Sequence, residues 1–233
     1  MPRKRWLVLT FLLAFPVFLI AGLPASIAVS QLQGLQPMGQ PLILRGASGT
    51  VWDGRSAVRW QGLNGQLAWR VQWQGLMPGV ALELTGDARL KGWLGAGQDA
   101  YALNLESGRL PAHLLGKFSK FSAEGSLDVD GLQLRLENQI LVEADGRLRY
   151  SGGQVGWPPR GSATMPPLEA ILTPAPEGAA LAVTGPEGEQ LMAGSVRGNQ
   201  GELAVYRAWP ALLGVSRGGN NSDVVFQTSA PLW

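Results

Sequence analysis

Apolar and polar residues alternate with a period of two along most of the chain after residue 40. In the clearest segment, Leu67, Trp69, Val71 and Trp73 alternate with small or polar residues. This period places alternate side chains on one face of an extended chain, so it predicts β-strands with one apolar face. Similar alternation predicts strands near residues 80–84, 88–90, 101–105, 127–129, 132–136, 148–150, 181–183 and 203–205.

Turn-forming residues separate these segments, and the gaps are too short for the helical crossovers that a parallel sheet needs. The predicted turns fall at residues 86–87, 97–99, 130–131, 145–146, 152–153, 158–159, 186–188 and 198–199. Short helices are predicted only at residues 110–121 and 207–215. The sequence therefore predicts an all-β fold, with an extended, mostly antiparallel, curved β-sheet body.

Residues 158–176 hold six prolines and are predicted to form a loop or an edge region. This stretch could divide the body into a larger first part and a smaller second part.

The N-terminus carries its charge only at its start, in Arg3, Lys4 and Arg5. The uncharged stretch of residues 6–23 follows, and it continues without charge to residue 29. A membrane-spanning helix needs about 20 apolar residues, so this stretch is predicted to be a single transmembrane helix. The positive-inside rule then predicts a cytoplasmic tip at residues 1–5 and a periplasmic β-rich domain at residues 30–233.

A cleaved signal peptide is the alternative interpretation of this N-terminus. Ser26-Ile27-Ala28 offers small residues at the spacing of a cleavage site, with cut before Val29. The apolar run is longer than the usual core of a signal peptide, which favours a retained anchor. Both interpretations export the body to the periplasm.

Composition excludes several function classes. The chain has no cysteine, which removes disulfides, thiolate nucleophiles and most structural zinc sites. Its net charge of +2 falls to −1 without the three basic residues of the tip. No basic cluster remains in the body, so nucleic-acid binding is not expected.

The residues that suggest chemistry lack the partners that the chemistry needs. His113 is the only histidine and stands in no metal-binding pattern. Asp128 and Asp130 share a predicted strand face and lead directly into a glycine turn, so a cation would need further oxygen ligands. The Gly-rich residues 46–49 lack the spacing of a serine hydrolase, and residues 92–97 lack the lysine of a phosphate loop. No catalytic, cofactor-binding or metal-ligating residue is predicted, and no enzyme.

Nine tryptophans stand out, and five of them lie within residues 52–93. We expect them to form the core of the sheet, because Trp69 and Trp73 share a strand face with Leu67 and Val71. The alternative is an exposed aromatic surface for a lipid or protein partner.

Residues 46–57 read GASGTVWDGRSA, and Leu67 through Gly86 continue with alternating Leu, Trp and Gly positions. Together they resemble the type II secretion system protein N family. Gly49 and Gly54 permit tight turns on either side of Trp52, which is expected to anchor a hairpin to the sheet.

The resemblance implies an accessory inner-membrane subunit of the type II secretion system, with a structural role in export of folded proteins across the outer membrane. Its expected partners are the inner-membrane lipid bilayer and other secretion-system subunits, and no cofactor or oligomeric state is predicted. The alternative is a membrane-anchored periplasmic β-groove protein that handles lipid or another apolar ligand, because long apolar strand faces could curl into a groove.

Overall fold

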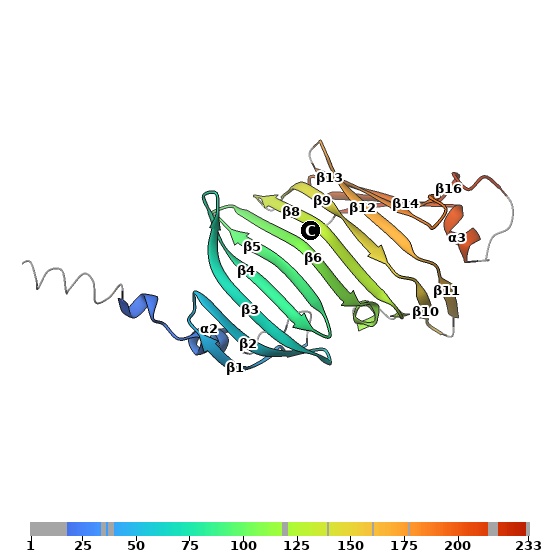
Figure 1. The fold of residues 1–233 in the computed structure, drawn as a ribbon. Coiled ribbons are helices and arrows are strands. Elements are labelled where there is room, and N and C mark those ends of the chain that lie inside the picture. Colours follow the sequence, from blue (N-terminus) through green and yellow to red (C-terminus); the bar gives the residue numbers. More distant parts are fainter. Residues whose placement is uncertain are drawn as a thin grey trace, which may run out of the picture.

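The computed structural model describes residues 18–33, 36, 40–117, 121–138, 140–159, 161–176, 178–213 and 219–231. Within these residues, thirteen strands form one sheet and three short strands form a second one (Figure 1). The main sheet contains, in spatial order, β1 (Ile43–Gly49), β2 (Asp53–Trp60), β3 (Leu63–Gln74), β4 (Met77–Gly86), β5 (Arg89–Ala96), β6 (Ala100–Pro111), β8 (Ser126–Glu137), β9 (Ile140–Tyr150), β12 (Leu168–Ala175), β13 (Gly178–Thr184), β14 (Gln190–Arg197), β15 (Gln200–Tyr206) and β16 (Val224–Pro231). The small sheet contains β11 (Gly161–Met165), β10 (Gly153–Trp157) and β7 (Ser122–Ala123).

Every neighbouring pair in the two sheets is antiparallel. The order of the main sheet follows the chain, interrupted only where β7, β10 and β11 leave it for the small sheet. Such a meander arises because each strand pairs with the next one across a short connection. The predicted all-β, antiparallel body is confirmed.

Two predicted turns are wrong. Gly131 and Gly146 lie inside β8 and β9, with φ of 60° and 143°, and the pairing of the two strands shifts its register beside them. Glycine accepts these positive φ values at little cost, so the chain forms a bulge and the strand continues. The separately predicted strands at 127–129 and 132–136 are therefore one strand.

The loop or edge region expected at residues 158–176 is confirmed for β11, an edge strand of the small sheet, and is wrong for β12. β11 and β12 occupy most of this stretch, and β12 pairs on both sides, with β9 and with β13. Pro166, Pro167 and Pro174 are compatible with this arrangement, since two of them precede β12 and one lies near its end.

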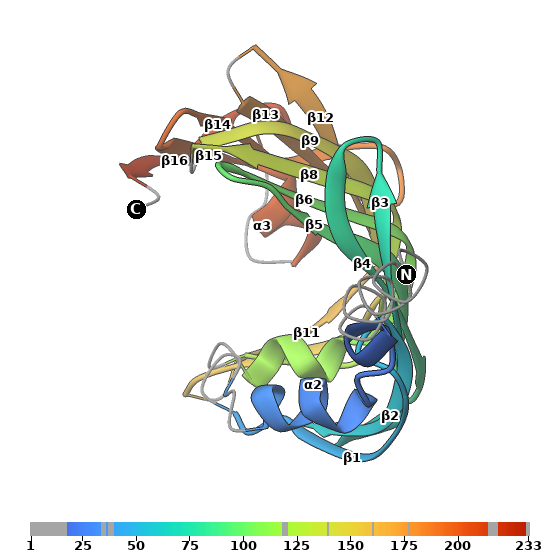
Figure 2. The ribbon, with the colours of Figure 1, turned by 90° about the vertical axis from the view of Figure 1, so that its left-hand side faces the viewer.

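The main sheet curls into an open trough, C-shaped when it is viewed along its axis (Figure 2). The helices α2 (Ala25–Leu32) and α3 (Ala208–Leu212) and the 3₁₀ helix η2 (Ala112–Lys117) lie on the inner side of the curl. α2 covers β1, and there Ala25, Val29 and Leu44 are buried together. The positions of η2 and α3 agree with the short helices predicted at residues 110–121 and 207–215, although both helices are shorter than predicted.

No helix among the described residues has both the length and the apolar character needed to cross a membrane. Most of the predicted spanning stretch, residues 6–17, lies outside the described part of the chain.

Candidate functional site: an uncharged trough with an apolar rim

One row of paired residues crosses the inner face of the sheet from β2 to β16. It contains one residue per strand and not one charged side chain, and all but Ser56 are apolar or glycine. Such uniformity across twelve strands gives this row an uncharged, almost entirely apolar character. The row runs Ser56, Leu67, Leu84, Leu90, Gly108, Val129, Leu148, Ala170, Val183, Met192, Val205, Phe226.

The adjacent row, on the outer face, has the opposite character in its first half. Five of its members are charged, and they fall on the strands from β2 to β9. The strand period of two separates the two rows, because neighbouring residues point to opposite faces. This outer row runs Arg55, Ala68, Glu83, Lys91, Ser107, Asp130, Arg147, Ile171, Ala182, Ala193, Ala204, Gln227.

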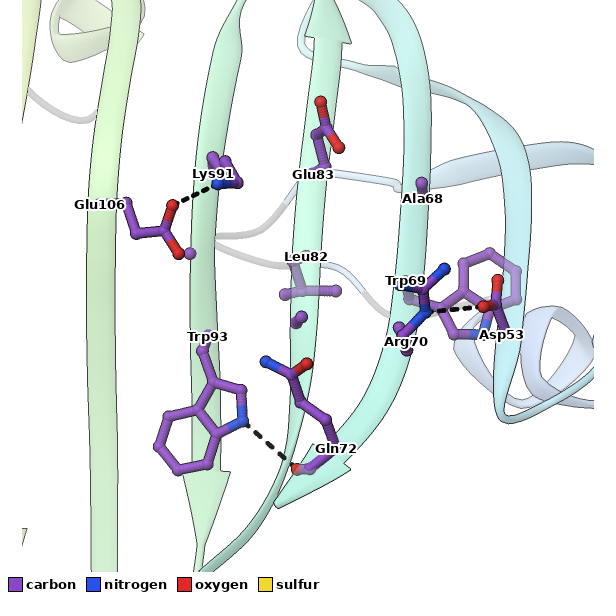
Figure 3. A pocket seen from close by; sticks show the side chains of 12 residues that line it. Asp53, Ala68, Trp69, Arg70, Gln72, Leu82, Glu83, Lys91, Trp93 and Glu106 are labelled. Carbon is purple, nitrogen blue, oxygen red and sulfur yellow. Dashed lines mark hydrogen bonds and ion pairs between the residues drawn. The ribbon is translucent and has the colours of Figure 1, made fainter. Parts of the chain in front are cut away.

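Charged side chains of the outer face pair with one another around a shallow hollow between β2 and β6 (Figure 3). Arg70 Nε donates a hydrogen bond to Asp53 Oδ2 at 2.7 Å, and Lys91 Nζ binds Glu106. The Glu106 carboxylate raises the pKa of Lys91, chiefly through this hydrogen bond and then through its charge. All four side chains are more than half exposed, so these are solvated surface ion pairs.

Among the described residues, no second sheet covers the inner face. In a β-sandwich an opposing sheet covers the apolar face at about 10 Å. Here short helices lie on the inner side of the described part, and most of the apolar side chains of this face stay half-buried. Leu44 and Leu191 are the largest fully buried side chains among the described residues. The trough is therefore an open apolar surface.

The C-terminal half of the trough holds a hollow of about 350 Å³. Leu172, Leu181, Leu203 and Gly194 are among the residues that line it. A Cβ placed on Gly194 would have its nearest neighbours 3.5 Å away, which is ordinary contact. The hollow thus has room for an apolar group.

One end of the trough carries large exposed apolar side chains. Trp73 is 68% exposed, Leu76 96%, Leu94 49% and Tyr101 54%. They lie together because antiparallel pairing brings the β3–β4 and β5–β6 turns to the same end of the sheet. We call these four residues the rim.

The N-terminal segment joins the sheet at this same end. The amide of Val51 donates a hydrogen bond to the carbonyl oxygen of Leu23 at 2.9 Å, and Val71 donates to Trp52 at 2.7 Å. The β1–β2 hairpin therefore contacts both the N-terminal segment and β3, the strand that carries Trp73.

The sequence predicted that Trp52 anchors the hairpin to the sheet, and this prediction is wrong. It is 41% exposed, and its indole N–H donates to the carbonyl oxygen of Ile20. Trp69 takes the expected role, because its ring lies where a Cβ on Gly54 would stand. The expectation that the tryptophans are buried is confirmed for Trp93, which is 5% exposed and lies on the outer face. It is wrong for Trp73, which is 68% exposed.

The residues considered for chemistry do not come together. His113 is exposed on η2. Asp128 is paired with Arg109, and Asp130 lies one position further along the outer face. Among the described residues, no three histidine, aspartate or glutamate side chains are grouped so that they could hold a metal ion.

The rim residues Leu76, Leu94 and Tyr101 were not singled out from the sequence. Each of them lies in or near a turn, and a large apolar residue at such a position was the signal from which an exposed rim could have been predicted. Alternation alone assigns them to strands and does not show which strand ends meet.

The geometry defines an open, curled antiparallel sheet with an uncharged inner face. The family described as type II secretion system (T2SS), protein N, matches residues 40–209, which include all strands from β1 to β15. The chain belongs to this family.

A curated relative, the type II secretion system protein N of Vibrio cholerae serotype O1 (strain ATCC 39315 / El Tor Inaba N16961), is 30% identical over 162 residues. The match covers 60% of this chain and 59% of that relative. The chain thus spans less than two thirds of the length of this relative. No solved structure matches the chain.

Proposed function

We propose that this protein is an accessory inner-membrane subunit of the type II secretion system, with a structural role in the export of folded proteins across the outer membrane. The observation that carries the proposal is the family match, because it spans the trough from β1 to β15. The proposed role is structural and not enzymatic. The pairing of Arg70 with Asp53 and of Lys91 with Glu106 supports this, because all four side chains are more than half exposed, as in ordinary surface ion pairs.

Deletion of the gene in its own host tests this role. The expected result is loss of exoprotein from the medium and its accumulation in the periplasm, restored by the full chain. The protein should also co-purify with inner-membrane subunits of the apparatus. Normal secretion by a deletion strain with an otherwise intact apparatus would overturn the proposal.

The proposed topology has residues 1–5 in the cytoplasm, residues 6–23 across the membrane and residues 30–233 in the periplasm. The charge asymmetry of the N-terminus supports it. So does the exit of the N-terminal segment at the rim, which would place the rim next to the bilayer.

Single-cysteine variants test this topology cleanly, because the natural chain has no cysteine. A membrane-impermeant maleimide should label Gln31→Cys in intact spheroplasts and should label Lys4→Cys only after permeabilisation. Labelling of both, or a mature protein that begins at Val29, would overturn the single-pass arrangement.

A second candidate function is that of a membrane-anchored periplasmic β-groove protein that handles lipid or another apolar ligand. The uncharged inner row and its partial burial favour it. Native mass spectrometry of the full chain, released gently from membranes, should then detect a bound small molecule. A trough that is empty under these conditions would count against this candidate.

A further inference from the structure

We propose that the trough binds the acyl chains of membrane phospholipids and that these chains enter over the rim. The proposal rests on the second candidate function and names its ligand class and its entrance.

The chemistry of the inner face selects the ligand. An extended peptide carries an N–H and a C=O at every residue, and burying them without partners costs free energy. The inner row offers Ser56 alone as a polar side chain, and its hydroxyl already donates to the carbonyl oxygen of Arg45 at 2.9 Å. An acyl chain has no polar group along its length, so it loses nothing against such a surface.

The dimensions agree with a lipid tail. The twelve residues of β8 extend about 40 Å at about 3.3 Å per residue. An acyl chain spans half of the bilayer core, about 15 Å. A tail lying along the strands therefore fits within the length of the trough, and the hollow beside Gly194 offers further room for an apolar group.

The rim supplies the entrance. Trp73 and Tyr101 have the amphipathic rings that favour the membrane interface, and Leu76 is almost fully exposed beside them. Behind the rim, the inner face continues without charge along β3 to β6: Val71 pairs with Val80, Val80 with Leu94, and Leu94 with Leu103. A tail that leaves the bilayer at the rim thus meets an apolar path into the trough.

Photocrosslinking tests the proposal. The full chain is incorporated into vesicles of phosphatidylethanolamine and phosphatidylglycerol that contain a phosphatidylethanolamine with a diazirine on its acyl chain. After irradiation, labelled peptides should include inner-face residues of β12 to β15 as well as the N-terminal segment. Label confined to the N-terminal segment would overturn the proposal.

Two matched variants sharpen the result. Gly194→Phe fills the hollow with an apolar ring, so it should reduce labelling of β12 to β15 several-fold without introducing charge. Thr173→Phe adds the same ring to the exposed outer face of β12 and should leave the labelling unchanged. Equal labelling of Gly194→Phe and the natural chain would overturn binding in the hollow.

Replacement of Trp73 and Leu76 by serine tests the entrance. The lipid probe should label the trough of this rim variant more slowly than the trough of the natural chain. An unchanged rate of labelling would overturn entry at the rim. Recovery of a protein segment from the trough in place of lipid would overturn the ligand assignment. Secretion is measured separately, in the deletion strain. Normal secretion by that strain would overturn the accessory-subunit role, and labelling of the trough in the natural chain would leave this inference standing.

Discussion

Trp52 and Ile20 are joined by a hydrogen bond of 2.9 Å from the indole N–H to the backbone carbonyl oxygen. Together with the bond from Val51 to Leu23, it fastens the N-terminal segment to the β1–β2 hairpin.

Trp52→Phe keeps an aromatic ring and removes the donor. We expect this junction to weaken by about 0.5–1.5 kcal/mol, the usual net value of one hydrogen bond. Hydrogen exchange should show faster exchange of the Val51 amide and of residues 20–24. Trp73→Phe, at the exposed rim, is the control, and equal exchange in both variants would contradict the assignment.

Gly54→Ala should destabilise the protein. A Cβ at this buried position would collide with the ring of Trp69 and lie 2.9 Å from the carbonyl oxygen of Thr50. Overpacking of this kind typically costs about 1–3 kcal/mol. Thermal unfolding should show a lowered midpoint. Gly97→Ala, whose Cβ would have its nearest neighbour at 3.6 Å, should change the midpoint little.

The Tyr150 hydroxyl donates to the carbonyl oxygen of Glu124 at 2.7 Å. Burial raises the pKa of Tyr150, and the charge of Glu124 raises it further. The folded state therefore holds the phenolic proton more tightly than the unfolded chain, whose pKa is about 10. Its stabilising contribution is present below that pH and is lost as the pH rises through the unfolded pKa towards the folded one.

Tyr150→Phe tests this directly. The variant should lose about 0.5–1.5 kcal/mol of stability at neutral pH, from the missing hydrogen bond. Its unfolding free energy should then fall less steeply at alkaline pH than that of the natural chain. Tyr101→Phe removes an exposed hydroxyl and serves as the control. Parallel alkaline profiles for the natural chain and Tyr150→Phe would refute the prediction.

A lysine reports which face a position occupies. Leu84→Lys introduces a charge on the half-buried inner face and should cost about 1–3 kcal/mol, within the usual range of destabilising substitutions. Ala68→Lys places the same charge on the exposed outer face, opposite Glu83, and should cost little. Denaturant titration of both variants measures the difference, and equal losses would show that the faces are assigned wrongly.

Alternation in the sequence determined much of the fold. Leu67, Trp69 and Val71 share a face as predicted, since the strand period of two fixes the side of each residue once the strand is known. The family signature at residues 46–57 is a continuous stretch, so it could be recognised without knowledge of the fold. Gly131 and Gly146 were mistaken for turns, because a glycine after an aspartate favours a turn and a bulge alike, and only pairing across β8 and β9 distinguishes them.

The tertiary structure alone decided what lies opposite the apolar face. Alternation predicts one apolar side for a filled sandwich and for an open trough, because it records which side chains avoid water and not what covers them. The curl of the sheet, the position of Trp73 and Tyr101 at the same end and the hollow beside Gly194 depend on how several strands pair side by side, which the alternation along each strand does not record. The sequence by itself determined an uncharged face, and the folding of thirteen strands into one curve made it a trough.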